Sequence, residues 1–308
     1  MPKPTAKSLE WPTLAMLVLT YAVFGFGTMI WDHSIVLSLL LTTLSVTQFS
    51  SLQHEVLHGH PFASKRLNEA LVFVGITFFV PYARFRDTHL VHHYDPNLTD
   101  PYDDPEANYL DPAVWANLRP AVQWLLRANN TLCGRILLGP AVSMWSFCAT
   151  DIAAIRLGNR AILAAWLWHG IGVGLVLAWL AACASMPIWA YVLAAYIGFG
   201  LLKIRTFLEH RAHEICRARS VIVEDRGLLA LLFLNNNLHA VHHMHPGAAW
   251  YKLPGIYAAR RAHYLRRNDA YVYKNYYQIF RSFLFTAKDP VPHPVWPVTK
   301  TAASVAEG

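Results

Sequence analysis

The chain has 308 residues, of which 55% are hydrophobic and 15% charged, with a mean hydropathy of +0.27 and a formal net charge of +7. It is more apolar than an ordinary soluble domain, so the composition indicates a membrane protein. Positive charge also suits nucleic-acid binding, but so apolar a chain argues against that class. We expect the basic residues to face anionic lipid headgroups.

Four long apolar stretches are candidate membrane spans. They cover about residues 11–31, 34–53, 161–183 and 187–205, and the fourth is long enough only if it continues through Lys203. A bilayer core requires about 20 apolar residues per helix, and the short connectors predict two helical hairpins. Two shorter runs, 70–83 and 136–150, contain proline and are expected to be re-entrant or interfacial.

Basic residues lie on one side of these spans. The connectors within the hairpins carry no lysine or arginine, whereas lysine and arginine residues follow the second and fourth spans. Because basic loops stay in the cytoplasm, we expect a multi-pass protein, of a bacterial inner membrane, with cytoplasmic termini. Residues 1–288 are predicted to form one domain, with a cytoplasmic cap from 54–160 and 206–288. Residues 289–308 are expected to be a disordered, proline-rich tail.

Three histidine motifs follow the apolar segments. One HxxxH motif continues the second span and an HxxHH motif occurs twice, which gives eight histidines: His54, His58, His89, His92, His93, His239, His242 and His243. Residues three and four apart share a helix face, so each motif directs its imidazoles at one spot. Imidazole suits iron, copper, zinc and nickel, but one zinc takes about four ligands. Eight histidines therefore predict two metal ions, which we interpret as a di-iron site.

Several neighbouring residues extend this candidate site. His210, past the fourth span, is a ninth histidine that we expect at the same depth. Side chains close to the ligands can fix an imidazole through its second ring nitrogen, and the candidates for that role are Glu55, Asp87, Glu209, His60, His213 and His245. The acidic run 100–106 is expected to position the loop after the second motif or to cap a helix, rather than to bind metal. His169 is expected to pack through a hydrogen bond, and His33, His263 and His293 to lie at the surface.

Two other functional classes compete with an iron enzyme. The stretch His54-Glu55-Val56-Leu57-His58 also satisfies HExxH, the zinc motif of metalloproteases, in which the glutamate is the general base. That function would leave the six histidines of the HxxHH motifs unexplained. A metal transporter would need polar groups inside the spans, and only Gln48 and His169 interrupt them notably. The pattern favours an enzyme over both.

The ordered trio HxxxH, HxxHH and HxxHH resembles the membrane fatty acid desaturase family over nearly the whole chain, as do residues 99–106 and 235–238. The resemblance implies an all-α integral membrane fold, shaped like a mushroom, with four transmembrane helices in two hairpins and a helical cytoplasmic cap holding a di-iron site. It implies a histidine ligand after the fourth span, which His210 matches, with His213 as the alternative. It also implies an asparagine that reaches the metal through water, for which Asn236 is chosen and Asn235 and Asn237 stay possible.

The predicted function is an O2-dependent fatty acyl desaturase of lipid metabolism and fatty acid biosynthesis. Two iron ions are the expected cofactors, O2 the co-substrate and a lipid acyl chain the substrate, with no catalytic residue beyond the metal ligands. A di-iron hydroxylase or other oxygenase of an alkyl or apolar substrate is the alternative, because both reactions share one metal site. No flavin, NAD or haem motif is present, so we expect an external electron donor, namely a ferredoxin, a rubredoxin or a cytochrome b5-like protein with its reductase.

Overall fold

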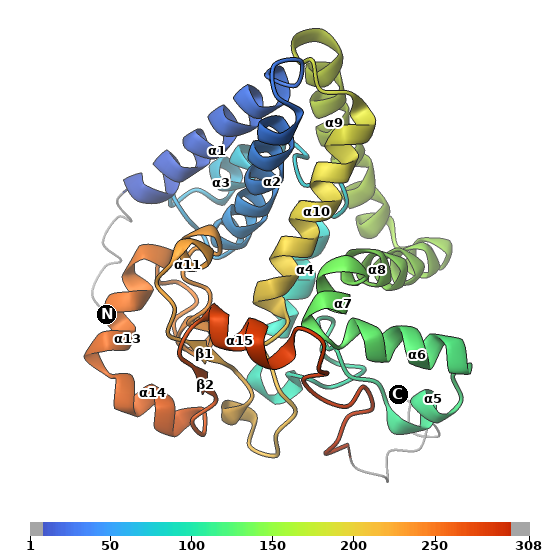
Figure 1. The fold of residues 1–308 in the computed structure, drawn as a ribbon, viewed down its shortest axis with the longest axis vertical. Helices are drawn as coiled ribbons and strands as arrows, with labels where there is room; N and C mark the ends of the chain where they lie inside the picture. Colours follow the sequence, from blue (N-terminus) through green and yellow to red (C-terminus); the bar gives the residue numbers. More distant parts are fainter. Residues whose placement is uncertain (1–8, 297–308) are drawn as a thin grey trace.

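The computed structural model describes residues 9–296, and their regular secondary structure is almost entirely helical. A tapering bundle of long helices stands on a broader layer of short ones (Figure 1). We call the bundle's helices α1 (Trp11–Met29), α2 (Ile35–Leu57), α9 (Arg160–Cys183) and α10 (Ile188–Thr206). The broader layer, residues 81–159 and 207–296, is called the cap.

All four bundle helices are long and apolar enough to cross a membrane. They form the two expected hairpins, α1 with α2 and α9 with α10, and α2 continues to Leu57, past the predicted end of the second span at Gln53. Ser34 and Asn159 cap α2 and α9 by accepting backbone N–H groups of the first turn. Lys203, in the last turn of α10, donates a 2.8 Å hydrogen bond to Ser143 in the cap.

The core of the bundle forms where α2 packs between α1 and α10. Gly198 allows α10 to approach α2 closely, since a Cβ there would lie 3.0 Å from the carbonyl oxygen of Thr43 and 3.0 Å from the Val46 side chain. Thr47 donates a 3.1 Å hydrogen bond to the Gly198 carbonyl across the same contact. Small residues and hydroxyl hydrogen bonds are typical of helix contacts in membranes.

The segment 72–80, between α3 (Lys65–Leu71) and α4 (Tyr82–His92), is irregular and packs against the bundle. Three side chains of the bundle helices bind carbonyl groups in or next to it: Tyr21 binds Leu71 O at 2.7 Å, Tyr191 binds Ile76 O at 2.8 Å and His169 binds Phe78 O at 2.8 Å. Irregular backbone at membrane depth needs such internal partners. His169 therefore has the hydrogen-bonded packing role expected of it.

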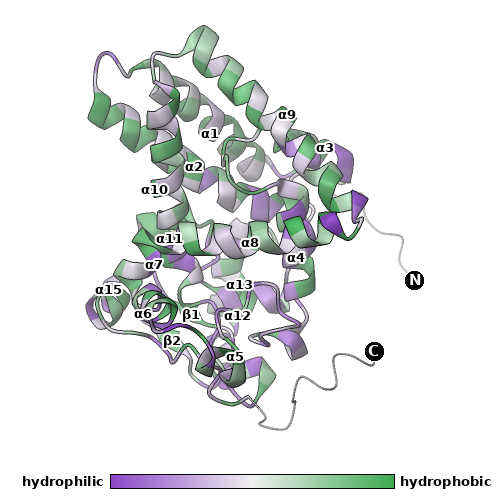
Figure 2. Ribbon diagram, turned by 90° about the vertical axis from the view of Figure 1, so that its right-hand side faces the viewer, coloured by the Kyte–Doolittle hydropathy of each residue, from purple (hydrophilic) through white to green (hydrophobic). Residues whose placement is uncertain are grey.

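The second short apolar run, 136–150, lies mostly in α8 (Gly139–Arg156). This helix runs across the junction of bundle and cap, roughly perpendicular to α10 (Figure 2). Its buried Asp151 accepts hydrogen bonds from Arg84 of α4 and, at 2.8 Å, from Trp166 of α9. On its outer face the Trp145 side chain is 80% exposed.

The other cap elements are short. The helices are α5 (Pro112–Ala116), α6 (Pro120–Asn129), α7 (Leu132–Leu137), α11 (Leu228–Leu232), α12 (His239–Met244), α13 (Leu253–Ala259), α14 (Arg261–Arg267) and α15 (Tyr276–Phe283). Strands β1 (Ile222–Val223) and β2 (Val272–Tyr273) form a parallel pair, with Ile222 opposite Val272. This pair is a small departure from an all-helical chain. Phe207 and Leu208, just past α10, pack with Phe233 and Ile279 and so join the bundle to the cap.

The start of the predicted disordered tail is ordered, which corrects that expectation. Within 289–296, Val291 and His293 are buried, although His293 was assigned to the surface. The extended chain pairs with Leu110 through hydrogen bonds of 2.9 and 2.8 Å. A proline-rich segment without hydrophobic periodicity can still pair its free backbone groups with another segment, and composition does not reveal that partner. The rest of the predicted tail, 297–308, lies outside the described residues.

Candidate metal centre

The nine candidate histidines converge at the junction of bundle and cap. His54 lies in the last turn of α2 and His58 caps its end, while His210 follows α10. The two HxxHH motifs lie on α4 and α12, which are short cap helices. Helices that belong to both hairpins thus deliver ligands to one place.

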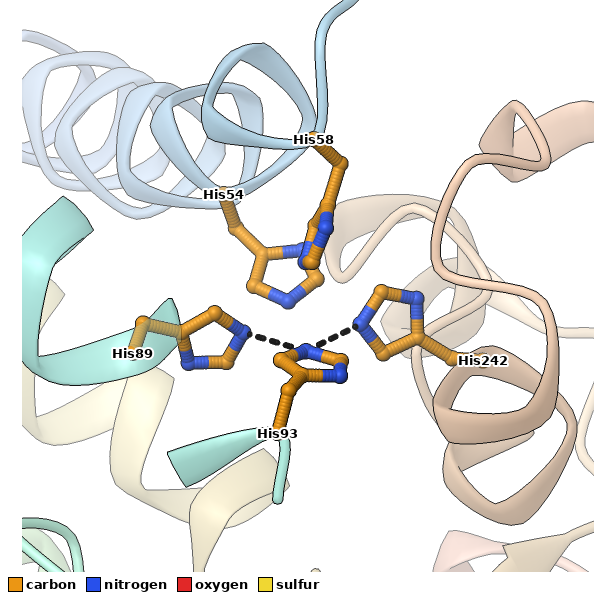
Figure 3. A group of neighbouring side chains, drawn as sticks. All are labelled: His54, His58, His89, His93 and His242. Carbon is orange, nitrogen blue, oxygen red and sulfur yellow. Dashed lines mark hydrogen bonds between the residues drawn. The ribbon is translucent and has the colours of Figure 1, made fainter. Parts of the chain in front are cut away.

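The histidines form two groups, and within each the candidate donor atoms all lie within 4.8 Å of one another. The first group is His54, His58, His89, His93 and His242, whose rings point at a common centre from α2, α4 and α12 (Figure 3). The second group is His92, His210, His239 and His243. Each HxxHH motif is therefore shared. Its two histidines four residues apart serve one group, and the histidine between them serves the other.

The contacts within the groups fit metal ions. Facing Nε2 atoms lie 2.8 Å apart in His92 and His210, and 3.0 Å apart in both His89–His93 and His210–His239. Where Nδ1 faces a carboxylate, which only accepts, the ring proton lies on Nδ1 and Nε2 carries a lone pair. A metal ion placed between two facing Nε2 atoms would bind a lone pair of each ring. Two imidazoles bound at right angles, each at about 2.1 Å, would place their nitrogens about 3 Å apart.

Burial keeps most of these imidazoles neutral, as metal ligands must be. It lowers the pKa of His210, His239, His242 and His243 well below the ordinary value, and neighbouring histidines add to this effect. Burial and the neighbouring His89 and His92 likewise lower the pKa of His93 to about 3.

His92 is the exception within the second group. Although burial opposes protonation, Glu106 and Asp104 raise the pKa of His92 to about 9, so a metal ion binding at Nε2 would displace a proton from this ring. Nδ1 of His92 donates a hydrogen bond to Asp104, and its Nε2 is directed at His210. A carboxylate in this position makes the imidazole a better metal ligand.

Two carboxylates that the sequence motifs do not identify, Glu106 and Asp104, support the histidines of the second motif. His89 Nδ1 is 3.0 Å from Glu106 Oε1, and His92 Nδ1 is 2.7 Å from Asp104 Oδ1. Asp104 is buried and also accepts the backbone N–H groups of Thr99 and Glu106. The run 100–106 was expected only to position a loop. The available signal was that each motif histidine needs a partner for Nδ1, and this run is the largest group of acidic residues near the second motif.

Glu209 and Asn236 lie next to Nδ1 of His239. Its Nδ1 lies 3.2 Å from Asn236 Oδ1 and 3.7 Å from Glu209 Oε1, and Arg205 pairs with that carboxylate at 2.9 Å. The side chains of Asn235 and Asn237 instead bind backbone carbonyls of Trp250, Val223 and Asp225. Asn236 is thus placed to orient His239, and a water-mediated contact from Asn236 to metal stays a prediction.

Three predicted supporting residues face elsewhere, which corrects their assignment. Asp87 is exposed and binds Arg86, because a residue two positions before His89 lies on another face of α4. His213 pairs with Asp269 at 3.4 Å, since the chain turns away after His210. His245 lies past the end of α12 and bonds the Tyr264 hydroxyl at 2.9 Å.

Glu55 and His60 belong to a third buried group with Glu10. Glu55 Oε1 accepts the backbone N–H of Trp250 at 2.9 Å and lies 3.8 Å from His60 Nε2. The other ring nitrogen of His60 contacts the Glu10 carboxylate. Glu55 therefore links the end of α2 to the segment after α12.

A bundle of four apolar helices above nine converging histidines defines an all-α membrane protein of the histidine-box type. The family model described as fatty acid desaturase matches residues 30–275, which is well over half of the chain. The chain belongs to the fatty acid desaturase family. Comparison with curated proteins gives no match.

Proposed function

We propose that this protein is an O2-dependent fatty acyl desaturase whose nine histidines hold two iron ions. The observation that carries the proposal is the convergence of nine histidines into two groups of donor atoms, in a chain of the fatty acid desaturase family. When bound, iron would supply reduction of O2 and removal of hydrogen from an unactivated C–H bond. Imidazole-rich sites suit iron.

The protein's own residues prepare such a site. Glu106 and Asp104 hold protons on Nδ1 of His89 and His92, which leaves both Nε2 atoms available for metal. Five of the nine histidines are buried and the other four are half-buried, which limits the access of water to a strong oxidant. Because the groups lie where α2 and α10 enter the cap, an acyl chain from the bilayer would meet them at the membrane surface.

The HExxH protease function is less well supported. Its general base would be Glu55, but that carboxylate accepts the Trp250 backbone N–H and lies beside His60. The protease would also leave the second histidine group without a role. Hydroxylation of an alkyl chain uses the same centre as desaturation, and the experiment below separates the two.

The electron donor is proposed to be a small acidic redox protein that docks on the cap from the cytoplasm. A shallow depression on the cap is lined by Arg217, Arg267 and His243. His243 belongs to the second group, so this depression brings the surface close to the metal centre. Complementary charge speeds such encounters.

The test is mass spectrometry of total fatty acids from a bacterial host that expresses the protein or its His89→Ala variant. We expect a product lighter by two hydrogens only with the intact protein. A product heavier by one oxygen would establish hydroxylation instead. His263→Ala, at an exposed cap histidine, is the matched control and should keep the activity. Retained product in His89→Ala would contradict the di-iron proposal.

A further inference from the structure

The last described segment, 288–296, lies beyond the residues that the family model matches, which end at 275. We call it the C-terminal strap. It begins with Lys288, whose largely buried ammonium group donates a 2.6 Å hydrogen bond to the backbone carbonyl of His210. It therefore touches the backbone of a second-group histidine.

The strap is anchored beside that contact. Lys288 N donates to Asn130 O at 3.1 Å, and the Asn130 side chain returns a hydrogen bond to Asp289 O. Tyr109 donates its hydroxyl proton to Asp289 at 2.5 Å and accepts the backbone N–H of Ala212 at 2.9 Å. The turn 210–212 is thus held directly by Lys288 and indirectly, through Tyr109, by Asp289.

The far end of the strap is connected to His92 of the second group through a chain of hydrogen bonds. His293 Nε2 lies 3.2 Å from Thr99 Oγ1, and Thr99 N donates to Asp104 Oδ2 at 2.8 Å. Asp104 in turn accepts from His92 Nδ1 at 2.7 Å. Thr99 has φ +69°, a conformation that is costly for a β-branched residue and needs support from its surroundings.

We propose that the C-terminal strap positions the second histidine group for metal binding. The two lines of contact end at His210 and at His92, and both belong to that group. Fixing the carbonyl of His210 sets the backbone that carries its ring, and fixing Asp104 sets the ring of His92. The inference rests on the metal centre proposed above. It assigns a role in that centre to a segment outside the family match.

The test compares two truncated proteins by their metal content after purification from iron-supplemented cells. A chain ending at Ala287 lacks the strap. A chain ending at Trp296 keeps every contact described here and is the matched control. We expect the first to retain about one metal per chain and the control two, because loss of supporting partners costs about 10- to 100-fold in metal affinity. Equal metal content in the two would overturn the inference.

Point variants keep the test valid if the shorter chain does not fold. Lys288→Met removes the hydrogen bond to His210 and keeps the apolar stem, and Lys274→Met is the control at an exposed cap lysine. Titration with Co2+, followed by visible absorption, should show weakened binding of one of two ions in Lys288→Met only. Two tight sites in that variant would refute the strap's role. A full-length protein that binds no metal would instead refute the proposed function.

Discussion

At the residue scale, hydrogen bonds from the second ring nitrogen of His89 and His92 to carboxylates are the feature typical of metal-binding histidines. His89 and His92 lie one turn apart on α4, and each has its own carboxylate, Glu106 and Asp104. These carboxylates decide which nitrogen carries the proton and therefore which nitrogen is free. The acidic loop after the second motif is thus part of the site.

Asp104→Asn should lower iron content at the second group. The amide is neutral, and it is a weaker partner for the proton on His92 Nδ1, so we expect about 10- to 100-fold weaker binding of one metal. Asp103→Asn, at the exposed neighbouring residue, is the control. Iron per chain measured across a chelator series would show the difference. Identical retention in both variants would remove Asp104 from the site.

At the element scale, the irregular segment 72–80 depends on its close approach to α9. A Cβ at Gly172 would lie 2.4 Å from the carbonyl oxygen of Phe73, whereas at Gly174 it would meet nothing within 4 Å. Close backbone contact between membrane segments requires such small residues. Packing against segment 72–80 therefore requires a glycine at position 172 but not at position 174.

Gly172→Ala should lower thermal stability in detergent, because the clash is with backbone and the segment must move. Gly174→Ala should be neutral or slightly stabilising, since alanine favours helix over glycine by about 1 kcal/mol. Unfolding of the two variants, followed by tryptophan fluorescence, compares them directly. Equal melting temperatures would show that segment 72–80 does not pack on α9 as described.

The contact of α8 with α4 and α9 is a second element-scale feature. Asp151 is 1% exposed and accepts hydrogen bonds from Arg84 with lengths from 2.8 to 3.1 Å. Asp151→Leu leaves Arg84, whose side chain is only 15% exposed, without its carboxylate, so we expect a loss of about 3 kcal/mol in unfolding free energy. Glu69→Leu breaks the more exposed pair with Arg86 and should cost about 1 kcal/mol or less.

Denaturant unfolding in mixed micelles would measure both variants. The double variant Arg84→Met/Asp151→Leu should recover part of the loss, because it leaves no unpaired buried charge. Additive losses would mean that the two side chains act independently.

At the scale of the whole molecule, the bundle tip and the cap should lie on opposite sides of the membrane. Cys183, at the end of α9, is exposed at the tip, whereas Cys133, Cys148 and Cys216 lie in the cap. From the basic residues of the cap, we propose that its side is cytoplasmic. The native cysteines can therefore report the orientation of the protein, and no cysteine needs to be introduced.

A membrane-impermeant thiol reagent should label the intact protein in spheroplasts of a bacterial host, and Cys183→Ser should abolish that labelling. Cys216→Ser should leave it unchanged until the membrane is opened. Labelling of Cys216 in sealed spheroplasts would reverse the proposed orientation.

The helices and the histidine motifs can be predicted from local sequence, whereas the assignment of each histidine to one of the two groups cannot. Apolar length alone predicts α1, α2, α9 and α10, because a span depends only on consecutive residues. Spacing shows that His89 and His93 share a face. It does not show that His242 joins them or that His92 joins His210, since these partners come from different helices.

The sequence by itself determined the protein's class, namely four apolar spans and three histidine motifs, because these signals are periodic or continuous along the chain. Only the tertiary structure decided which carboxylate supports which histidine and that the segment after Lys288 is ordered against the cap. The physical reason is that a hydrogen bond between distant residues depends on how the helices pack. Asp87 is closer in sequence to His89 than Glu106 is, yet it points away, because a helix turns about 100° per residue.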